Sequence, residues 1–173
     1  GSSSKNGLKN SGFEVDLADT RIGIDGIKNL NEVNFANYDA VILAHYADQR
    51  EGWLNNEEIE VINSRAGELI GYINGGGSLV SFGKNDSGNN APMDRYDFLP
   101  FLKAEKTNQY EKGIEATQFG KELGLTNQDL NSNYYHEYFT EYDVMKPVDI
   151  DLYNSNNDVE NAVVSVAIKG RNI

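Results

Sequence analysis

The chain has 173 residues, of which 39% are hydrophobic and 24% are charged, and its formal net charge is −12. This size and composition suit one domain with a single core, and no apolar run approaches the roughly 20 residues that span a bilayer. The acidic excess argues against nucleic acid as a partner, because phosphates are bound through Lys and Arg. The absence of cysteine excludes disulfides, thiolate metal sites and cysteine nucleophiles.

The N-terminal residues 1–7, GSSSKNG, look like an expression-tag remnant or a linker. We therefore expect a single domain over residues 8–173, as a fragment of a longer chain. A short helical tail is predicted to end at Gly12. Residues 13–17 then alternate between apolar and acidic side chains, which predicts a strand with one buried face. Residues 20–39 are interpreted as a loop with one helical turn.

The most regular segment of the chain predicts a helix over residues 57–73. Its apolar side chains recur on one helical face, and acidic residues fill its first turn. Either Asn55 or Asn56 can cap the start of this helix. Gly75 can supply a left-handed stop at its end.

Two apolar runs flank this helix and predict parallel strands. One strand is Ala40–Ala44, within a continuous apolar run that is typical of a central strand covered on both faces. The other strand is Ser78–Phe82. A strand, a helix, a glycine turn and a second strand form a βαβ unit. We therefore expect these two strands to lie at the centre of the sheet.

The rest of the chain predicts shorter elements. Residues 94–105 predict a short helix broken at Pro100, and residues 116–125 predict another helical turn. Residues 148–154 and 160–170 both alternate, which predicts an antiparallel pair joined by a turn. The predicted fold class is α/β, with a mainly parallel sheet flanked by helices and antiparallel strands at its C-terminal edge.

The segments SGFEVDLAD, FANYDAVILAH and YINGGGSLVSFG, with the helix before the last one, resemble the class I glutamine amidotransferase-like superfamily. The closest likeness is to its divergent ThuA-like branch and to accessory domains of secreted proteins. Tyr38–Asp39 and Leu69–Leu79 carry the match. The resemblance implies a flavodoxin-like sheet. It also implies a loop after the SLVSF strand that holds a cysteine nucleophile in true amidotransferases, where this chain has Gly83 and Lys84.

The carboxyl edge of such a sheet is where open α/β folds place their ligands. His45 ends the first central strand, a glycine-bearing loop follows the second, and the remaining histidine lies in an aromatic segment. Lys84 and backbone amides there would suit a neutral or anionic small molecule such as a sugar. We predict a ligand site without catalytic residues, metal or cofactor, formed by His45, Tyr46, Gly83, Lys84, Asn85 and His136.

Other interpretations are weaker. Ser81 lacks the G-x-S-x-G context of a nucleophile, and the loop after it lacks the spacing of a P-loop. Residues 149–160 carry oxygen ligands that calcium prefers, but a hairpin turn explains them better, because no register fits an EF-hand. The tyrosines within residues 134–142 either stack on a sugar or a protein, or pack in the core.

Taken together, these features favour a non-catalytic binding or interaction module within a larger secreted or surface-attached protein, with a carbohydrate or a protein as partner. The alternative is a ThuA-like enzyme or sugar-binding protein that acts on a small carbohydrate between His45 and the Gly83 loop. Because the resembled enzymes need a thiolate nucleophile, we predict no amidase activity. We expect an extracellular or cell-surface location, with the cytoplasm as the alternative.

Overall fold

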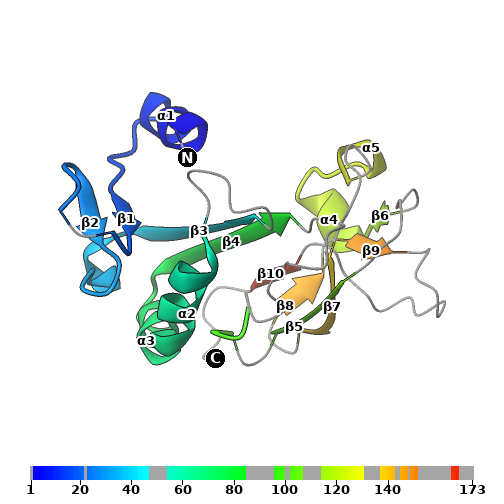
Figure 1. Cartoon of the computed structure of the whole chain (residues 1–173). Helices are drawn as coiled ribbons and strands as arrows, with labels where there is room; N and C mark the ends of the chain where they lie inside the picture. The colour runs from blue at the N-terminus through cyan, green and yellow to red at the C-terminus, as the bar shows by residue number, and fades with distance from the viewer. Residues whose placement is uncertain are drawn as a thin grey trace.

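The computed structural model describes residues 2–21, 23–46, 54–84, 96–99, 102–106, 114–130, 137–142, 145–147, 149–151 and 165–167. These residues form a mixed α/β structure in which short helices accompany pairs of strands (Figure 1). Within the described residues, two strand pairs are parallel and three are antiparallel. The predicted α/β class is therefore confirmed at this coarse level.

The N-terminal part contains α1 (Ser2–Asn10), followed by the strands β1 (Leu17–Asp19) and β2 (Ile27–Asn29). The predicted end of the helical tail is confirmed, because Gly12 adopts the left-handed φ of 89° that stops a helix. The strand predicted over residues 13–17 begins only at Leu17. Of residues 13–16 only Val15 is partly buried, and Phe13 is 61% exposed.

β1 and β2 form a parallel pair although only residues 20–26 connect them. Parallel strands usually need a connection of about a dozen residues or more. Here Gly23 and Gly26 have φ values of 84° and 74°, which bring the chain back within this short loop. The sequence did not reveal this pair. The predicted helical turn before Ala40 is confirmed as η1 (Phe35–Asn37), capped by the Asn34 side chain.

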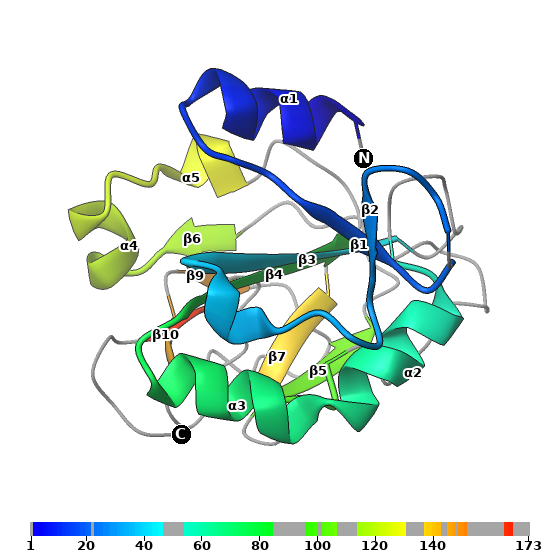
Figure 2. The same cartoon turned by 90° about the vertical axis from the view of Figure 1, so that its left-hand side faces the viewer.

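The centre of the fold is the parallel pair β3 (Ala40–Tyr46) and β4 (Ser78–Lys84). Ala40 lies opposite Ser78, and Tyr46 lies opposite Lys84. The prediction that these strands pair in parallel is therefore confirmed. Two helices connect the strands and lie together on one side of the pair (Figure 2).

The helix predicted over residues 57–73 is divided into α2 (Asn56–Ser64) and α3 (Ala66–Asn74) at Arg65. Asn55, one of the two predicted caps, caps α2 through a capping box with Glu58. The Asn55 side chain accepts the Glu58 amide at 2.9 Å, and the Glu58 carboxyl accepts the Asn55 amide at 2.8 Å.

The stop after α3 differs from the prediction. Gly75 remains right-handed, with a φ of −73°, and the next residue, Gly76, takes the left-handed φ of 98°. The Gly75 amide still continues the helical hydrogen bonding by donating to the Gly71 carbonyl. The chain can therefore reverse only one residue later than expected.

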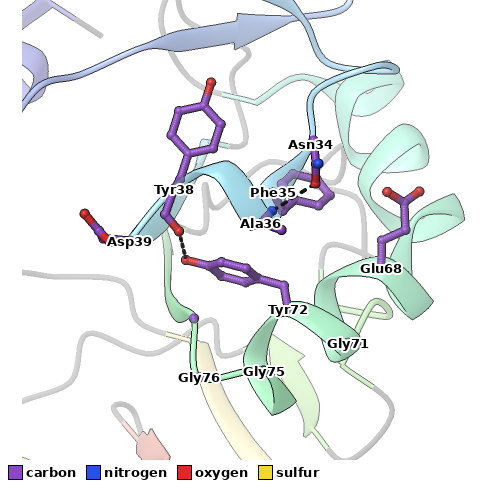
Figure 3. A pocket seen from close by; sticks show the side chains of 11 residues that line it. Asn34, Phe35, Ala36, Tyr38, Asp39, Glu68, Gly71, Tyr72, Gly75 and Gly76 are labelled. Atoms are coloured by element: carbon purple, nitrogen blue, oxygen red, sulfur yellow. Dashed lines mark hydrogen bonds between the residues drawn. The ribbon is translucent and has the colours of Figure 1, made fainter.

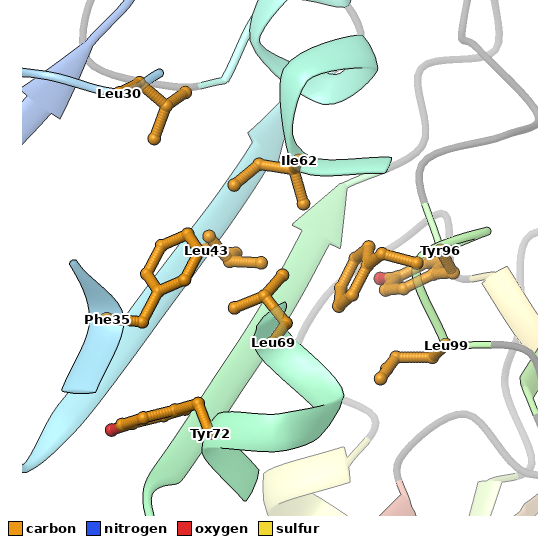
Figure 4. Packing of buried hydrophobic residues seen from close by; sticks show 9 residues of the cluster. Leu30, Phe35, Leu43, Ile62, Leu69, Tyr72, Tyr96 and Leu99 are labelled. Carbon is orange, nitrogen blue, oxygen red and sulfur yellow. The ribbon is translucent and has the colours of Figure 1, made fainter. Parts of the chain in front are cut away.

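The core lies between these helices and one face of the central strands (Figure 4). Its buried side chains are Leu30, Phe35, Leu43, Ile62, Leu69, Tyr72, Tyr96, Phe98 and Leu99. The opposite face was expected to be covered as well, and that expectation is wrong: Ile42 and Val80 are 42% and 48% exposed. An apolar run shows that a strand is apolar on both faces, but not that both faces have a neighbour.

The described C-terminal part consists of short strands and two short helices. Its elements are β5 (Leu102–Lys106), β6 (Ile114–Ala116), α4 (Gln118–Glu122), α5 (Asn127–Leu130), β7 (Glu137–Tyr142), β8 (Met145–Pro147), β9 (Asp149–Asp151) and β10 (Ser165–Ala167). The helical turn predicted within residues 116–125 is confirmed as α4.

Two predictions in this part are wrong. The helix predicted over residues 94–105 is a turn at 96–98 followed by β5. The predicted pairing of residues 148–154 with 160–170 is also replaced, since β9 pairs with β6 and β10 pairs with β8, both antiparallel. Alternation identified both segments as strands, but it carries no information about which strand is the partner.

Candidate functional site

The parallel register brings four of the six predicted site residues to one edge. His45 lies opposite Gly83, and Tyr46 lies opposite Lys84, at the carboxyl ends of β3 and β4. Asn85 and His136 lie outside the described residues. The backbone thus places the first four residues together, while the site as a whole stays a prediction.

The structure describes Ser81 but only parts of the calcium-like segment 149–160 and of the tyrosine-rich segment 134–142. Ser81 pairs with Leu43, and paired residues of neighbouring strands point to the same face of a sheet. Leu43 belongs to the buried core, so Ser81 faces the helices rather than the loop. Of the calcium-like segment only β9 is described, and of the tyrosine-rich segment only the backbone of β7.

A pocket of about 540 Å³ lies at the other end of the central strands, next to their first residues (Figure 3). Its walls contain the aromatic residues Phe35, Tyr38 and Tyr72 and the acidic residues Asp39 and Glu68. Asn34, Ala36 and the glycines of α3 and of the turn after it complete the lining. Sequence reasoning looked at the carboxyl edge and missed this pocket, although the Tyr-Asp pair and the glycine triplet both border it.

Tyr72 ties the starts of the two central strands together. Its hydroxyl lies 3.1 Å from the Tyr38 carbonyl oxygen and 3.2 Å from the Ser78 carbonyl oxygen, and it accepts the Ser78 amide at 3.1 Å. Burial raises the pKa of the Tyr72 phenol. The ring passes so close to Gly77 that a Cβ there would lie 2.2 Å from two ring carbons. This contact explains why the turn needs a glycine at position 77.

Tyr38 connects the rim of the pocket to the loop before β1. Its hydroxyl donates to Asp16 Oδ2 at 3.0 Å, and Lys28 Nζ lies 3.5 Å from the same oxygen. Burial, followed by the contact with Asp16, raises the pKa of the Tyr38 phenol. These contacts join segments that are far apart in sequence.

Arg65, at the junction of α2 and α3, contacts two residues of the pocket lining, Phe35 and Glu68. Its guanidinium donates to the Leu30 and Val33 carbonyl oxygens, both at 2.6 Å, and lies 4.3 Å from the centre of the Phe35 ring. It also donates to both carboxylate oxygens of Glu68, and this hydrogen bonding lowers the pKa of that carboxyl group. Arg65 therefore holds the η1 segment against α3.

A second polar cluster joins the end of β1 to the start of α2. Asp19 is 9% exposed and Glu58 is 5% exposed. Arg21 donates to Asp19 through its backbone amide at 2.9 Å and through Nε at 2.7 Å. Hydrogen bonding by Arg21 lowers the pKa of Asp19, whereas burial raises the pKa of Glu58. Two adjacent carboxyl groups thus have pKa values that are shifted in opposite directions.

Among the described residues, no group of three or more His, Cys, Asp or Glu side chains is arranged to hold a metal ion. In the same part of the chain, none of the helices combines the length and the apolar character needed to cross a membrane.

No family model, curated protein or solved structure matches the chain. Function is therefore inferred from the residues and their geometry.

Proposed function

We propose that this chain is a non-catalytic binding module of amidotransferase-like fold, within a larger protein that is secreted or attached to the cell surface. The observation that supports it best is the pocket beside the first residues of β3 and β4. Its volume of about 540 Å³ falls within the range of roughly 300–1,000 Å³ that is usual for small-molecule sites.

The flavodoxin-like part of the proposal draws support from the central strands. β3 and β4 are parallel and are connected through α2 and α3, which is the unit from which such sheets are built. The segments that carry the amidotransferase resemblance, Tyr38–Asp39 and Leu69–Leu79, lead into the first residues of β3 and β4 and border the pocket.

A neutral sugar is the ligand class that suits the pocket. Asp39 and Glu68 offer carboxylate oxygens that accept sugar hydroxyls, and Asn34 adds an amide group. Tyr38 is the partly exposed aromatic residue of the lining and offers a ring for stacking. None of the described lining residues is Lys, Arg or His, so an anion would find no counter-charge there.

Two glycines of α3 provide a matched test. A Cβ at Gly71, in the pocket wall, or at Gly67, outside the lining, would meet no atom outside the backbone of its own helix within 4 Å. Both glycines are exposed and neither has a positive φ, so a side chain at either position adds no backbone strain. Binding should be screened on an array of neutral oligosaccharides and then measured by calorimetry. We expect Gly71→Leu to weaken binding at least about tenfold and Gly67→Leu to leave it unchanged.

A second candidate is the ThuA-like enzyme or sugar-binding protein with its site at the carboxyl edge. The pairing of His45 with Gly83 favours it, because this register places a histidine beside a glycine loop. The double variant His45→Ala, Lys84→Ala tests it with the same sugar array. Loss of binding in this variant, together with unchanged binding by Gly71→Leu, would move the site to the carboxyl edge. Absence of binding by the wild-type protein to any sugar would contradict both candidates.

A further inference from the structure

The pocket beside the first residues of β3 and β4 carries negative charge in its wall. Its two acidic lining residues, Asp39 and Glu68, lie on opposite sides of Tyr72 (Figure 3). Within the described residues, no Lys, Arg or His belongs to the lining. The charge that a ligand meets therefore depends on how far each of the two carboxylates is neutralised by residues outside the lining.

Glu68 is neutralised by such a residue, whereas Asp39 is not. Arg65 donates to both carboxylate oxygens of Glu68, at 3.0 Å and 2.6 Å, and a guanidinium matches a carboxylate in charge and geometry. Asp39 is exposed, and no Lys or Arg in the part of the chain that the structure describes forms an ion pair with it. Asp39 is therefore the carboxylate whose charge is available to a ligand.

The C-terminal end of α3 adds to this negative charge. Residues 75–77 line the pocket, and the amides of Gly76 and Gly77 donate back to the carbonyl groups of Ile73 and Tyr72 to close the helix. The C-terminus of a helix carries a partial negative charge that favours cations. The last turn of α3 contains no basic residue. This end of the helix therefore has no cation in its own last turn.

Asp39 and the end of α3 lie next to each other. The Ser78 amide donates to the Asp39 carbonyl oxygen at 3.3 Å, and Ser78 follows Gly77 directly in the chain. Ala40, the residue after Asp39, is the register partner of Ser78. The free carboxylate and the negative helix end thus act on the same side of the pocket, away from the Arg65–Glu68 pair.

We propose that this pocket prefers a sugar that carries one protonated amino group, such as a hexosamine unit, over the same sugar with that amine acetylated. The inference rests on the proposed function, because the hydroxyl groups of an amino sugar would use the same acceptors as those of a neutral sugar. The ammonium group adds a positive charge and only donates hydrogen bonds. Asp39 and the end of α3 attract that charge, and acetylation of the amine removes it.

Matched trisaccharides test this preference. One pair is built on glucosamine and one on galactosamine, and each pair consists of a fully acetylated member and a member with one free amine. Calorimetry at low ionic strength measures the affinity of each. Asp39→Asn removes the charge and nearly keeps the shape of the side chain. Glu60→Gln, at an exposed position of α2 outside the lining, is the control for the loss of one charge from an acidic chain.

We expect the wild type and Glu60→Gln to bind the free-amine member of a pair about fivefold more tightly than the acetylated member. Asp39→Asn should keep a preference of about twofold, because the end of α3 remains. The preference of the wild type should decrease in salt, since exposed charges are screened.

Equal affinities of the wild type for the two members of each pair would overturn the inference, and this comparison does not depend on the folding of any variant. An undiminished preference in Asp39→Asn would overturn it as well. If the wild type binds a neutral sugar of the array but neither free-amine trisaccharide, this inference fails while the proposed function stands. If it binds no sugar at all, the proposed function fails, and this inference fails with it.

Discussion

Gly77 is the residue at which one added methyl group should disturb the fold most. The Tyr72 ring cannot retreat easily from a new Cβ, because its hydroxyl is held by the Tyr38 and Ser78 backbone groups and its side chain is buried. Overpacking of this kind costs about 1–3 kcal/mol. We expect Gly77→Ala to lower the free energy of unfolding by about 2 kcal/mol, as measured by urea unfolding.

Gly71→Ala is the control for this prediction. This glycine lies inside α3 with open space around it, and alanine is favoured over glycine in a helix by about 0.5–1 kcal/mol. Gly71→Ala should therefore raise the free energy of unfolding. Similar free energies of unfolding for the two variants would contradict the close packing of Tyr72 on Gly77.

At the scale of elements, the junction between α2 and α3 depends on Arg65. A lysine there would keep the charge but would lose the planar fork that reaches the Leu30 and Val33 carbonyl oxygens together. Hydrogen bonds from charged groups contribute about 1.5–3 kcal/mol each. We expect Arg65→Lys to lower the free energy of unfolding by about 2 kcal/mol, measured by thermal and urea unfolding.

Glu68→Gln separates this role of Arg65 from its ion pair with Glu68. The Glu68 side chain is 59% exposed, and an exposed ion pair contributes little to stability. Glu68→Gln should therefore cost less than Arg65→Lys. The reverse order would show that the ion pair, and not the bonds to the two carbonyl groups, holds the junction.

The sequence predicted some elements well because their signals are local. The parallel strands β3 and β4, the cap at Asn55 and the helical stripe after it follow from apolar periodicity and from the first helical turn. The break at Arg65 was not predictable in this way, since its partners Leu30 and Val33 lie more than 30 residues upstream. Pairing of the C-terminal strands is likewise a long-range property.

At the scale of the whole molecule, the candidate sites also depend on long-range contacts, which the sequence predicts poorly. The rule for open α/β sheets pointed to His45 and Gly83, and the register does place them side by side. Asp19 and Glu58 gave no such signal, because the chain has 27 Asp and Glu residues and only their burial sets these two apart among the residues that the structure describes. The pocket was missed because its wall is mainly a turn and a helix end, which sequence patterns assign to structure rather than to binding.

The last prediction concerns activity of the whole molecule: the purified protein should not hydrolyse glutamine. The chain has no cysteine to serve as a thiolate. Ser81, which precedes the expected nucleophile loop, shares the helix-facing side of the sheet with Leu43. A serine on that side cannot present its oxygen to a substrate at the carboxyl edge.

Ammonia release from glutamine should therefore equal the rate in buffer alone, for the wild type and for Ser81→Ala alike. Glutamine hydrolysis by the wild type that is lost in Ser81→Ala would show a serine nucleophile and would exclude the non-catalytic module. Hydrolysis that persists in Ser81→Ala but is lost in His45→Ala would instead place chemistry at the carboxyl edge, where His45 is paired with Gly83. Sugar binding measured on the same preparations shows whether a loss of activity reflects chemistry or a loss of folded protein.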